Sequence, residues 1–149
     1  MRSPTITLFD YQSLAEFRYQ IRRFLRFSEE ATRKAGIEPR QHQLLLAIKG
    51  LPAKERPRIG ALAERLQLEH HSTVELANRL AKGGYIRRVR DRHDRREVLL
   101  ELTAKGEKAL RDLSIHHRAE LQTVGPALMK ALLRVLRAGE TRSRKQTAS

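Results

Sequence analysis

The chain of 149 residues contains no cysteine and no tryptophan, and aromatic residues make up only 5% of it. Without cysteine it has no disulfide, no thiolate ligand for a metal and no cysteine-based redox sensor. It also contains no long uninterrupted apolar run, so we expect neither a signal peptide nor a membrane span, and we expect a cytoplasmic location. A chain of this length suits one domain or one compact subunit with a hydrophobic core.

Acidic residues are scarce relative to basic ones, because 17 Asp and Glu stand against 31 Lys and Arg and the formal net charge is +14. Such an excess of positive charge is typical of proteins that bind a polyanion, nucleic acid above all. Ribosomal proteins and membrane-surface proteins share it, so composition alone leaves the partner open.

Residue patterns that support catalysis are missing as well. Adjacent histidines on a helix point about 100° apart, so the pairs at residues 70–71 and 116–117 cannot place two metal ligands on one face. The sequence has no serine-centred elbow, no glycine-rich phosphate loop and no clustered pair of carboxylates. It therefore predicts no catalytic residues, no metal site and no cofactor.

Two short amphipathic helices are predicted after residue 58. In the first, residues 59–66, apolar side chains recur at helical spacing and leave the opposite face polar. After a tight turn at residues 67–69, the second helix buries one stripe, which consists of Thr73, Leu76, Ala77 and Leu80. Gly83 and Gly84 follow, as expected where a helix stops at a residue with positive φ.

A β-hairpin is predicted after the glycines, with arms at residues 85–90 and 96–102 and a tip at residues 91–95. β-Branched and aromatic residues occupy the arms, and the turn-forming Asp91 and Asp94 occupy the tip. Two helices joined by a tight turn and followed by a hairpin form a winged helix-turn-helix.

Amphipathic helices flank this unit on both sides. We expect one at about residues 10–35, one that begins near Pro39, and one that begins after Thr103 as its cap. Residues 125–126 (GP) are expected to end that helix, and a last helix to follow at about residues 127–136. The predicted segments are 1–36 and 104–137 for the flanking helices, 37–103 for the winged helix-turn-helix, and 138–149 for a disordered basic tail.

Five segments carry a family resemblance: residues 62–66 (LAERL), 79–80 (RL), 84–86 (GYI), 91–96 (DRHDRR) and 102–106 (LTAKG). They fall in register, without a gap, with the pattern of the MarR (multiple antibiotic resistance regulator) family. The D-x-x-D-R-R wing tip, followed at fixed distance by L-T-x-K-G, makes the match specific. The sequence thus resembles this family, which implies a mainly α protein: a winged helix-turn-helix with a small antiparallel β-wing and with N- and C-terminal dimerisation helices. The lack of cysteine departs from the family's hydroperoxide-sensing branch.

The flanking helices carry apolar faces that must be buried on something. One alternative is a monomeric helical cap, but a second copy is the expected partner, and the resemblance implies an intertwined homodimer. Two recognition helices related by a two-fold axis read an inverted repeat in double-stranded DNA, with half-sites about 10 bp apart or a multiple of that.

The resemblance implies a sequence-specific DNA-binding regulator of transcription. We expect a repressor that occludes a promoter and that releases DNA when a small effector binds. The alternative is an architectural protein that coats DNA with little sequence preference, drawn by the net charge of +14. The operator, the effector and the regulated genes cannot be read from the sequence.

Candidate DNA contacts on the second helix are residue types that bind phosphates and base edges. They line its amino end and its outer face and are His70, His71, Ser72, Thr73, Glu75, Asn78 and Arg79. There are structural alternatives, since Ser72 or Thr73 also caps a helix and Arg79 can pair with Glu75 one turn earlier. For Glu75 we favour this internal pair, because phosphates repel a carboxylate.

Candidate contacts at the wing tip are Arg92, Asp94, Arg95 and Arg96. The minor groove attracts arginine where A·T-rich sequence narrows it, and the family's pattern suggests that Asp94 orients Arg96. Arg87, Arg88 and Arg90 are expected on backbone phosphates or on the protein's own carboxylates. The alternative for any single arginine is a solvated charge.

The resemblance also implies a regulatory pocket between the dimerisation helices and the winged helix-turn-helix, a pocket that often accepts aromatic carboxylates. Here it would draw on Phe17, Tyr19, Ile21, Phe24, His42, Leu113 and His117. The same side chains would serve a dry core equally well, so core packing is the alternative for each of them.

Overall fold

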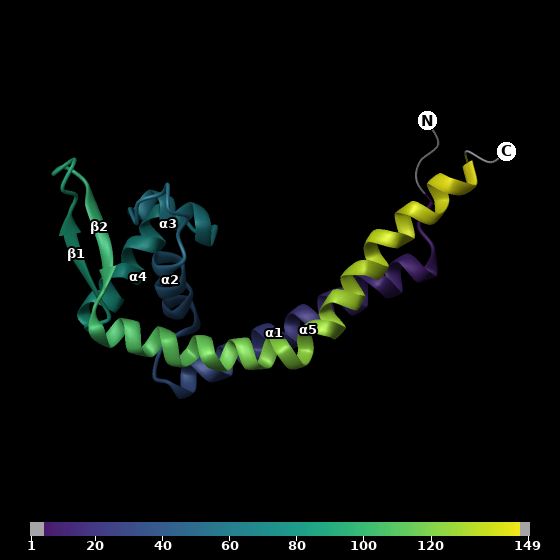
Figure 1. The fold of residues 1–149 in the computed structure, drawn as a ribbon, viewed down its shortest axis with the longest axis horizontal. Coiled ribbons are helices and arrows are strands. Elements are labelled where there is room, and N and C mark those ends of the chain that lie inside the picture. Colours follow the sequence, from purple (N-terminus) through teal and green to yellow (C-terminus); the bar gives the residue numbers. More distant parts are fainter. Residues whose placement is uncertain (1–4, 147–149) are drawn as a thin grey trace. The chain divides into compact units, whose positions relative to one another are not determined.

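The computed structural model describes the backbone of residues 5–146 and the side chains as far as Arg137. This part contains, in order, α1 (Leu8–Lys34), α2 (Pro39–Lys49), α3 (Ile59–Leu66), α4 (His70–Lys82), β1 (Ile86–Arg90), β2 (Val98–Leu102) and α5 (Ala104–Gln146) (Figure 1). Helices dominate and the strands form one two-stranded antiparallel sheet, which confirms the predicted fold class. None of the helices in the described part combines the length and the apolar character needed to cross a membrane.

The chain divides into two compact units. The first, called the winged unit, is residues 29–116, and the second, called the stem unit, is residues 1–28 together with residues 117–149. The winged unit contains α2, α3, α4 and the hairpin, with the end of α1 and the start of α5. It is therefore wider than the predicted winged segment, residues 37–103.

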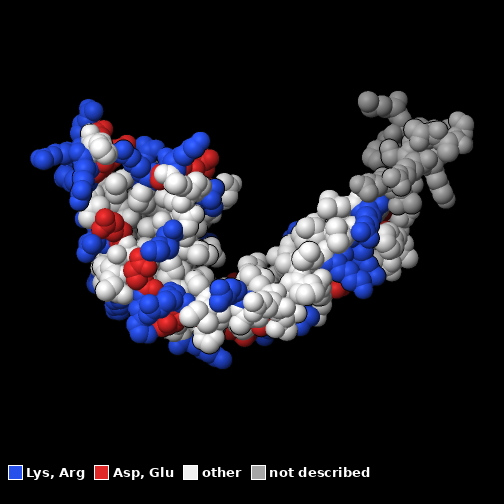
Figure 2. Space-filling model, viewed as in Figure 1, with Lys and Arg blue, Asp and Glu red and all other residues white. Residues whose placement is uncertain are grey.

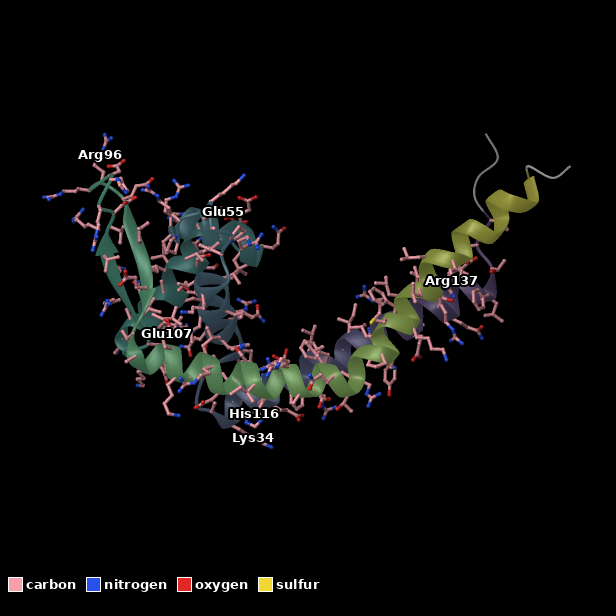
Figure 3. All side chains as sticks on the ribbon, viewed as in Figure 1. Lys34, Glu55, Arg96, Glu107, His116 and Arg137 are labelled. Atoms are coloured by element: carbon pink, nitrogen blue, oxygen red, sulfur yellow. The ribbon has the colours of Figure 1, made fainter. Side chains whose placement is uncertain are left out.

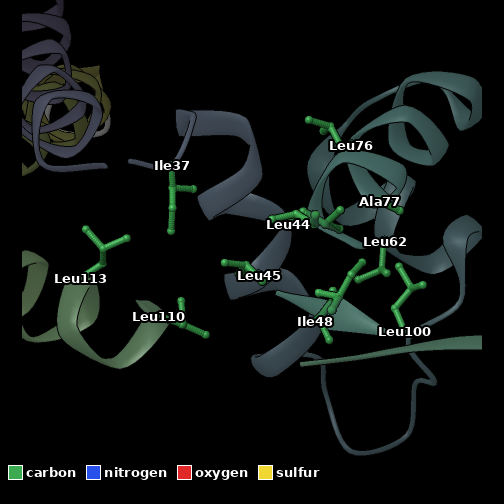
Figure 4. Close-up of a cluster of buried hydrophobic side chains, with 12 residues drawn as sticks. Ile37, Leu44, Leu45, Ile48, Leu62, Leu76, Ala77, Leu100, Leu110 and Leu113 are labelled. Carbon is green, nitrogen blue, oxygen red and sulfur yellow. The ribbon is translucent and has the colours of Figure 1, made fainter. Parts of the chain in front are cut away.

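One hydrophobic core holds the winged unit together (Figure 4). The side chains that α2, α3 and α4 contribute to it are Leu44, Leu45, Ile48, Leu62, Leu76, Ala77 and Leu80. Leu110 and Leu113 of α5 pack into the same core, which is why the start of that helix belongs to this unit. The predicted buried stripe of α4 is confirmed in full, because Thr73, Leu76, Ala77 and Leu80 are all buried.

The end of α4 sets the start of the hairpin. Gly84 has a φ of +78°, in the left-handed region that favours glycine. The amide of Tyr85 donates to the carbonyl of Leu80 at 2.9 Å, and the amide of Gly84 donates to the carbonyl of Ala81 at 3.0 Å, which is the Schellman pattern. The predicted stop at a glycine with positive φ is confirmed and lies at Gly84.

The hairpin faces the core with one side. β1 and β2 pair so that Ile86 lies opposite Leu102 and Arg88 lies opposite Leu100, and both Ile86 and Leu100 are buried. Directly paired residues share a face of the sheet, so Arg88 lies on the same side of the hairpin as Leu100, although its own side chain is exposed.

The structure of α5 corrects one prediction. Residues 125–126 do not end the helix, since Pro126 lies inside it and the helix extends from Ala104 to Gln146. A proline inside a helix costs about 3 kcal/mol, yet the helix continues through it, and of the side chains from residue 127 to residue 137 only that of Ala131 is buried. The predicted disordered tail, 138–149, is helical in its backbone as far as Gln146, and its last three residues lie outside the described residues.

The stem unit exposes apolar side chains along both of its helices. On α5 they are Leu121, Met129, Leu132, Leu133 and Leu136, with exposed fractions from 39% to 65%. On α1 they include Tyr11, Leu14 and Leu25. The spacing of each set places it on one side of its helix. These eight side chains remain exposed within the described part of the chain, and we call them the stem face.

Candidate nucleic-acid interface

α4 is the second helix of the helix-turn-helix and thus its recognition helix. It presents a polar face opposite its buried stripe. The exposed members of this face are His70, His71, Glu75, Asn78 and Arg79, and Ser72 is half-buried. Every predicted contact on α4 except Thr73 therefore lies where a ligand can reach it.

Thr73 does not belong to the polar face. Its side chain is fully buried, and its hydroxyl donates to the carbonyl oxygen of Glu69 at 3.0 Å. The prediction of a DNA contact at Thr73 is therefore corrected. The hydroxyl completes the first turn of the helix, and a side chain that water cannot reach cannot reach a groove.

Arg79 forms an ion pair, but with a partner that we did not predict. Its Nη1 lies 3.3 Å from Oε2 of Glu38, the N-cap residue of α2, whereas Glu75 on its own helix was the expected partner. Both side chains of the observed pair are more than half exposed, so water and salt screen it. Phosphate oxygens can compete with Glu38, and Arg79 stays available to DNA.

Asn78 is tied to the hairpin. Nη2 of Arg88 on β1 donates to Oδ1 of Asn78, which joins the recognition helix to the first strand. We expected Arg88 on phosphates or on a carboxylate, and no sequence pattern links it to an amide on another element. The Nδ2 group of Asn78 keeps its two donors for a base edge or a phosphate.

Two aspartates order the wing tip. Oδ1 of Asp91 accepts the amide of His93 at 2.9 Å, and Oδ1 of Asp94 accepts the amide of Arg96 at 3.0 Å, as expected of Asx turns. Asp94 also accepts Nε of Arg96 at 3.2 Å, so it orients this arginine as predicted.

Positive charge gathers around the tip of the hairpin (Figure 2). The side chain of Arg96 is 93% exposed (Figure 3). Arg92 and Arg95 are exposed too, and neither side chain has an ion pair or a hydrogen bond within the described part of the chain.

The acidic side chains of the hairpin do not neutralise these arginines. Each of the four forms an ion pair with an arginine other than Arg92 and Arg95. The pairs are Asp91 with Arg56, Asp94 with Arg96, Glu97 with Arg58, and Glu101 with Arg87. Uncompensated arginines beside a polar helix face are the electrostatic condition for binding a phosphate backbone.

Our sequence reasoning missed the loop between α2 and α3. Arg56 and Arg58 of this loop pair with Asp91 and Glu97 of the hairpin. A buried carboxylate needs a cation as its partner. The sequence contains 31 Lys and Arg, and no sequence pattern indicates that the partner comes from a loop distant in the chain.

The L-T-x-K-G segment fastens the end of α4 to the start of α5. Thr103 caps α5 as predicted, because its hydroxyl oxygen accepts the amide of Gly106 at 3.2 Å, and the same hydroxyl donates to the carbonyl of Gly84. Nζ of Lys105 donates to the carbonyl of Gly83 at 2.7 Å. These bonds fix where the recognition helix ends relative to the hairpin.

Two of the predicted effector contacts meet in the stem unit. The rings of Phe24 and His117 pack edge-on with centroids 6.1 Å apart, and Phe27 approaches the same imidazole at 5.9 Å. A ring nitrogen of His117 lies 2.6 Å from Oγ of Ser28. Phe27 and Ser28 were not among the predicted contacts, although they lie one helical turn after Phe24.

The other predicted effector contacts lie on α1 and in the winged unit. Phe17 and Ile21 are half-buried on α1, and Tyr19 is 49% exposed. His42 and Leu113 are buried inside the winged unit. Core packing, the alternative reading of these residues, describes His42 and Leu113 best.

A groove on the winged unit was not predicted. Its volume is about 470 Å³, and its lining comes from α2 with its C-cap and from α3: Gln43, Leu46, Ala47, Gly50, Arg65 and Leu66. It shares no residue with the predicted effector contacts. Among the described residues, no three His, Asp or Glu side chains are arranged to hold a metal ion.

Known proteins resemble this chain both in sequence pattern and in fold. Residues 35–97 match the model of the MarR family, and no curated protein matches the chain by sequence. Among solved structures, AbsC, a MarR family transcriptional regulator from Streptomyces coelicolor, matches with a TM-score of 0.71 at 17% identity, over 99% of this chain and 100% of that one. A mutant of MepR from Staphylococcus aureus, bound to an oligodeoxyribonucleotide, matches with a TM-score of 0.62 at 19% identity, over 96% and 99% of the two chains.

A MarR family protein from Bacillus stearothermophilus matches as well, with a TM-score of 0.66 at 19% identity, over 97% of this chain and 100% of that one. At these identities the solved structures establish the fold, and the family model adds the sequence pattern of the helix-turn-helix and the wing. The winged-helix part of the chain, residues 35–97, therefore matches the sequence pattern of the MarR family, and the chain shares its fold with solved members of that family.

Proposed function

We propose that the chain is a sequence-specific DNA-binding regulator of transcription. The observation that carries this proposal is the exposed polar face of α4 beside a hairpin whose tip bears arginines that no carboxylate neutralises. A helix in the major groove reads base edges, and a wing beside it reaches the backbone or the minor groove. The family match of residues 35–97 and the likeness to a MepR mutant solved with an oligodeoxyribonucleotide support the same function.

The recognition helix α4 and the wing contact different parts of the DNA. Ser72 and Asn78 contact base edges, because they are short polar side chains on the accessible face of α4. Arg92 and Arg95 enter the minor groove or contact phosphates, since their guanidinium groups have no partner within the described residues. His70, His71, Arg79 and Arg96 add contacts to the backbone at the rim of this surface.

We further propose a homodimer formed through the stem face. The eight apolar or aromatic side chains of the stem face are all exposed in the single chain, and a two-fold axis would bring the stem faces of two copies together. Two recognition helices related by this axis would read an inverted repeat. A regulator of this kind represses when its operator overlaps a promoter.

Relief of repression by a small aromatic or carboxylate effector completes the proposal. An effector releases DNA only if it binds the DNA-incompetent form of the dimer more tightly than the competent form, and the ratio of these affinities sets the size of the effect. The cluster of Phe24, Phe27 and His117 is the candidate contact for such a ligand, because it joins aromatic surface to an imidazole.

Substitutions in the wing and on α4 should affect binding differently. Arg95→Ala should weaken binding to every duplex and reduce the slope of log Kd against log salt by about 1, as expected for one lost phosphate contact. Asn78→Ala should mainly change which base is preferred at one position, by about 1–3 kcal/mol. Fluorescence anisotropy over a range of salt, with a selected duplex and a scrambled one, measures both effects.

Arg33→Ala is the matched control for the wing variant. Arg33 already pairs with Glu29 at 3.8 Å, so its loss removes the same charge from outside the proposed interface, and the salt slope should stay close to that of the wild type. A wing variant that binds as well as this control would remove the wing from the interface.

A further inference from the structure

The carboxylate of Asp91 is buried within an exposed hairpin, since the residue is only 4% exposed. A buried carboxylate is destabilising unless hydrogen bonds and a cation compensate its charge. Oδ1 accepts the amide of His93, and Oδ2 lies against the guanidinium of Arg56. Arg56 comes from the loop between α2 and α3, so this ion pair joins the wing tip to a distant part of the chain.

Two more contacts hold the same loop against the hairpin. Nη1 of Arg58 lies 3.0 Å from Oε1 of Glu97, and the amide of Leu100 donates to the carbonyl of Pro57 at 3.0 Å. The second of these uses the edge of β2 that does not pair with β1. Arg58 is also the N-cap residue of α3, so this loop, residues 56–58, leads directly into the helix-turn-helix.

The hairpin is therefore held on both sides. Arg88 of β1 ties one side to Asn78 of the recognition helix, and the loop holds the other side. An isolated two-stranded hairpin is only marginally stable in water, so its orientation depends on such anchors. Of these anchors, only the pair of Arg56 and Asp91 has a buried carboxylate. Loss of Arg56 would leave this buried charge uncompensated, so it should destabilise the hairpin more than loss of any other anchor.

We propose that Arg56 is a positioning residue of the DNA interface: it neutralises Asp91 and thereby holds the wing arginines in a fixed register with α4. This rests on the proposed function. Without the guanidinium, the carboxylate of Asp91 draws water into its site, and the turn that begins at Asp91 loosens. Arg95 then reaches DNA from many orientations instead of one, and its contribution to affinity falls although its own side chain is intact.

Hydrogen exchange tests the anchor without DNA. Three amides report on the tip, since Asp91 donates to Glu97, Glu97 donates to Asp94, and His93 donates to the carboxylate of Asp91. In Arg56→Gln these amides should exchange at least about tenfold faster, as expected for local opening, whereas amides in α2 should be unaffected. Unchanged exchange at the tip would overturn the proposal. Faster exchange throughout the winged unit would overturn it too, because Arg56 would then act on overall stability.

A double-mutant cycle tests the positioning role on DNA. With a duplex selected for binding from random sequence, Arg95→Ala should weaken binding about tenfold in the wild-type background and at most about twofold in the Arg56→Gln background. If Arg95→Ala weakened binding equally in both backgrounds, Arg56 would contribute to DNA affinity only through its charge and not by positioning the wing. Arg56→Lys should restore most of the coupling, because an ammonium can still neutralise Asp91.

Arg33→Gln provides the matched control for this cycle. It removes one positive charge from an ion pair on α1 and should be additive with Arg95→Ala. If the wild type binds no duplex, the proposed function fails, and the exchange measurement still decides whether Arg56 anchors the wing. If the wild type binds and the cycle is additive, the positioning role fails while the proposed function stands.

Discussion

Leu132→Asp should convert the protein from a dimer into a monomer at micromolar concentration. Leu132 lies in the middle of the apolar series on α5 and is 40% exposed in the single chain. Two-fold symmetry would bury two copies of each substituted side chain, and an unpaired carboxylate in an apolar interface is strongly unfavourable. The dissociation constant of the dimer should rise by at least about a hundredfold. Affinity for an inverted repeat should fall with it, because each monomer contacts one half-site.

Sedimentation measures this directly, since one chain has a mass of 17.2 kDa. Leu46→Asp is the matched control, because Leu46 is 49% exposed but lies on α2 in the winged unit, outside the stem face. This variant should sediment at twice the chain mass, like the wild type. A wild type that sediments as a well-folded monomer would contradict the dimer and, with it, the inverted repeat.

Gly106→Ala should lower the free energy of unfolding by about 3 kcal/mol, as expected for overpacking against a rigid neighbour. Gly106 is buried in the first turn of α5, and a Cβ at this position would overlap the carbonyl oxygen of Tyr85. That carbonyl cannot move aside without breaking the hairpin, because it accepts the amide of Thr103 at 3.0 Å. Urea denaturation followed by circular dichroism provides the measurement.

Gly60→Ala is the matched comparison, because it makes the same substitution at a position where an added Cβ meets no neighbouring atom. Gly60 lies in the first turn of α3, and a Cβ there would meet no atom within 4 Å. Alanine should raise the free energy of unfolding by up to about 1 kcal/mol, because glycine loses more conformational entropy on folding. Equal stability of the two alanine variants would mean that the close approach of α5 to Tyr85 is absent in solution.

The parts of the fold that sequence reasoning could predict are those set by local spacing. Leu76, Ala77 and Leu80 repeat at helical spacing, and this repeat alone identifies the buried side of α4. Gly84 marks the end of that helix because few other residues adopt its backbone conformation. The hydrogen bond from Arg96 to Asp94 spans two residues, so turn chemistry was enough to anticipate it.

Contacts between separate elements could not be predicted in this way. Arg79 pairs with Glu38 on another helix instead of Glu75 on its own, and periodicity describes only neighbours within one element. Gln67 ends α3 with a φ of +54°, a conformation that its side chain does not favour and that no residue type signalled. Pro126 stops no helix here, although a proline in a helix interior is locally unfavourable.

Competition against bulk genomic DNA tests the central claim, sequence-specific recognition, most directly. A labelled duplex recovered by selection from the protein's own genome is held at near-saturating protein and physiological salt, and sheared genomic DNA is added in excess. The proposed regulator should keep its duplex until the competitor exceeds it about a thousandfold in base pairs, the lower end of usual specificity ratios. Displacement in simple proportion to the added base pairs would contradict the claim and identify a protein that coats DNA through its net charge of +14.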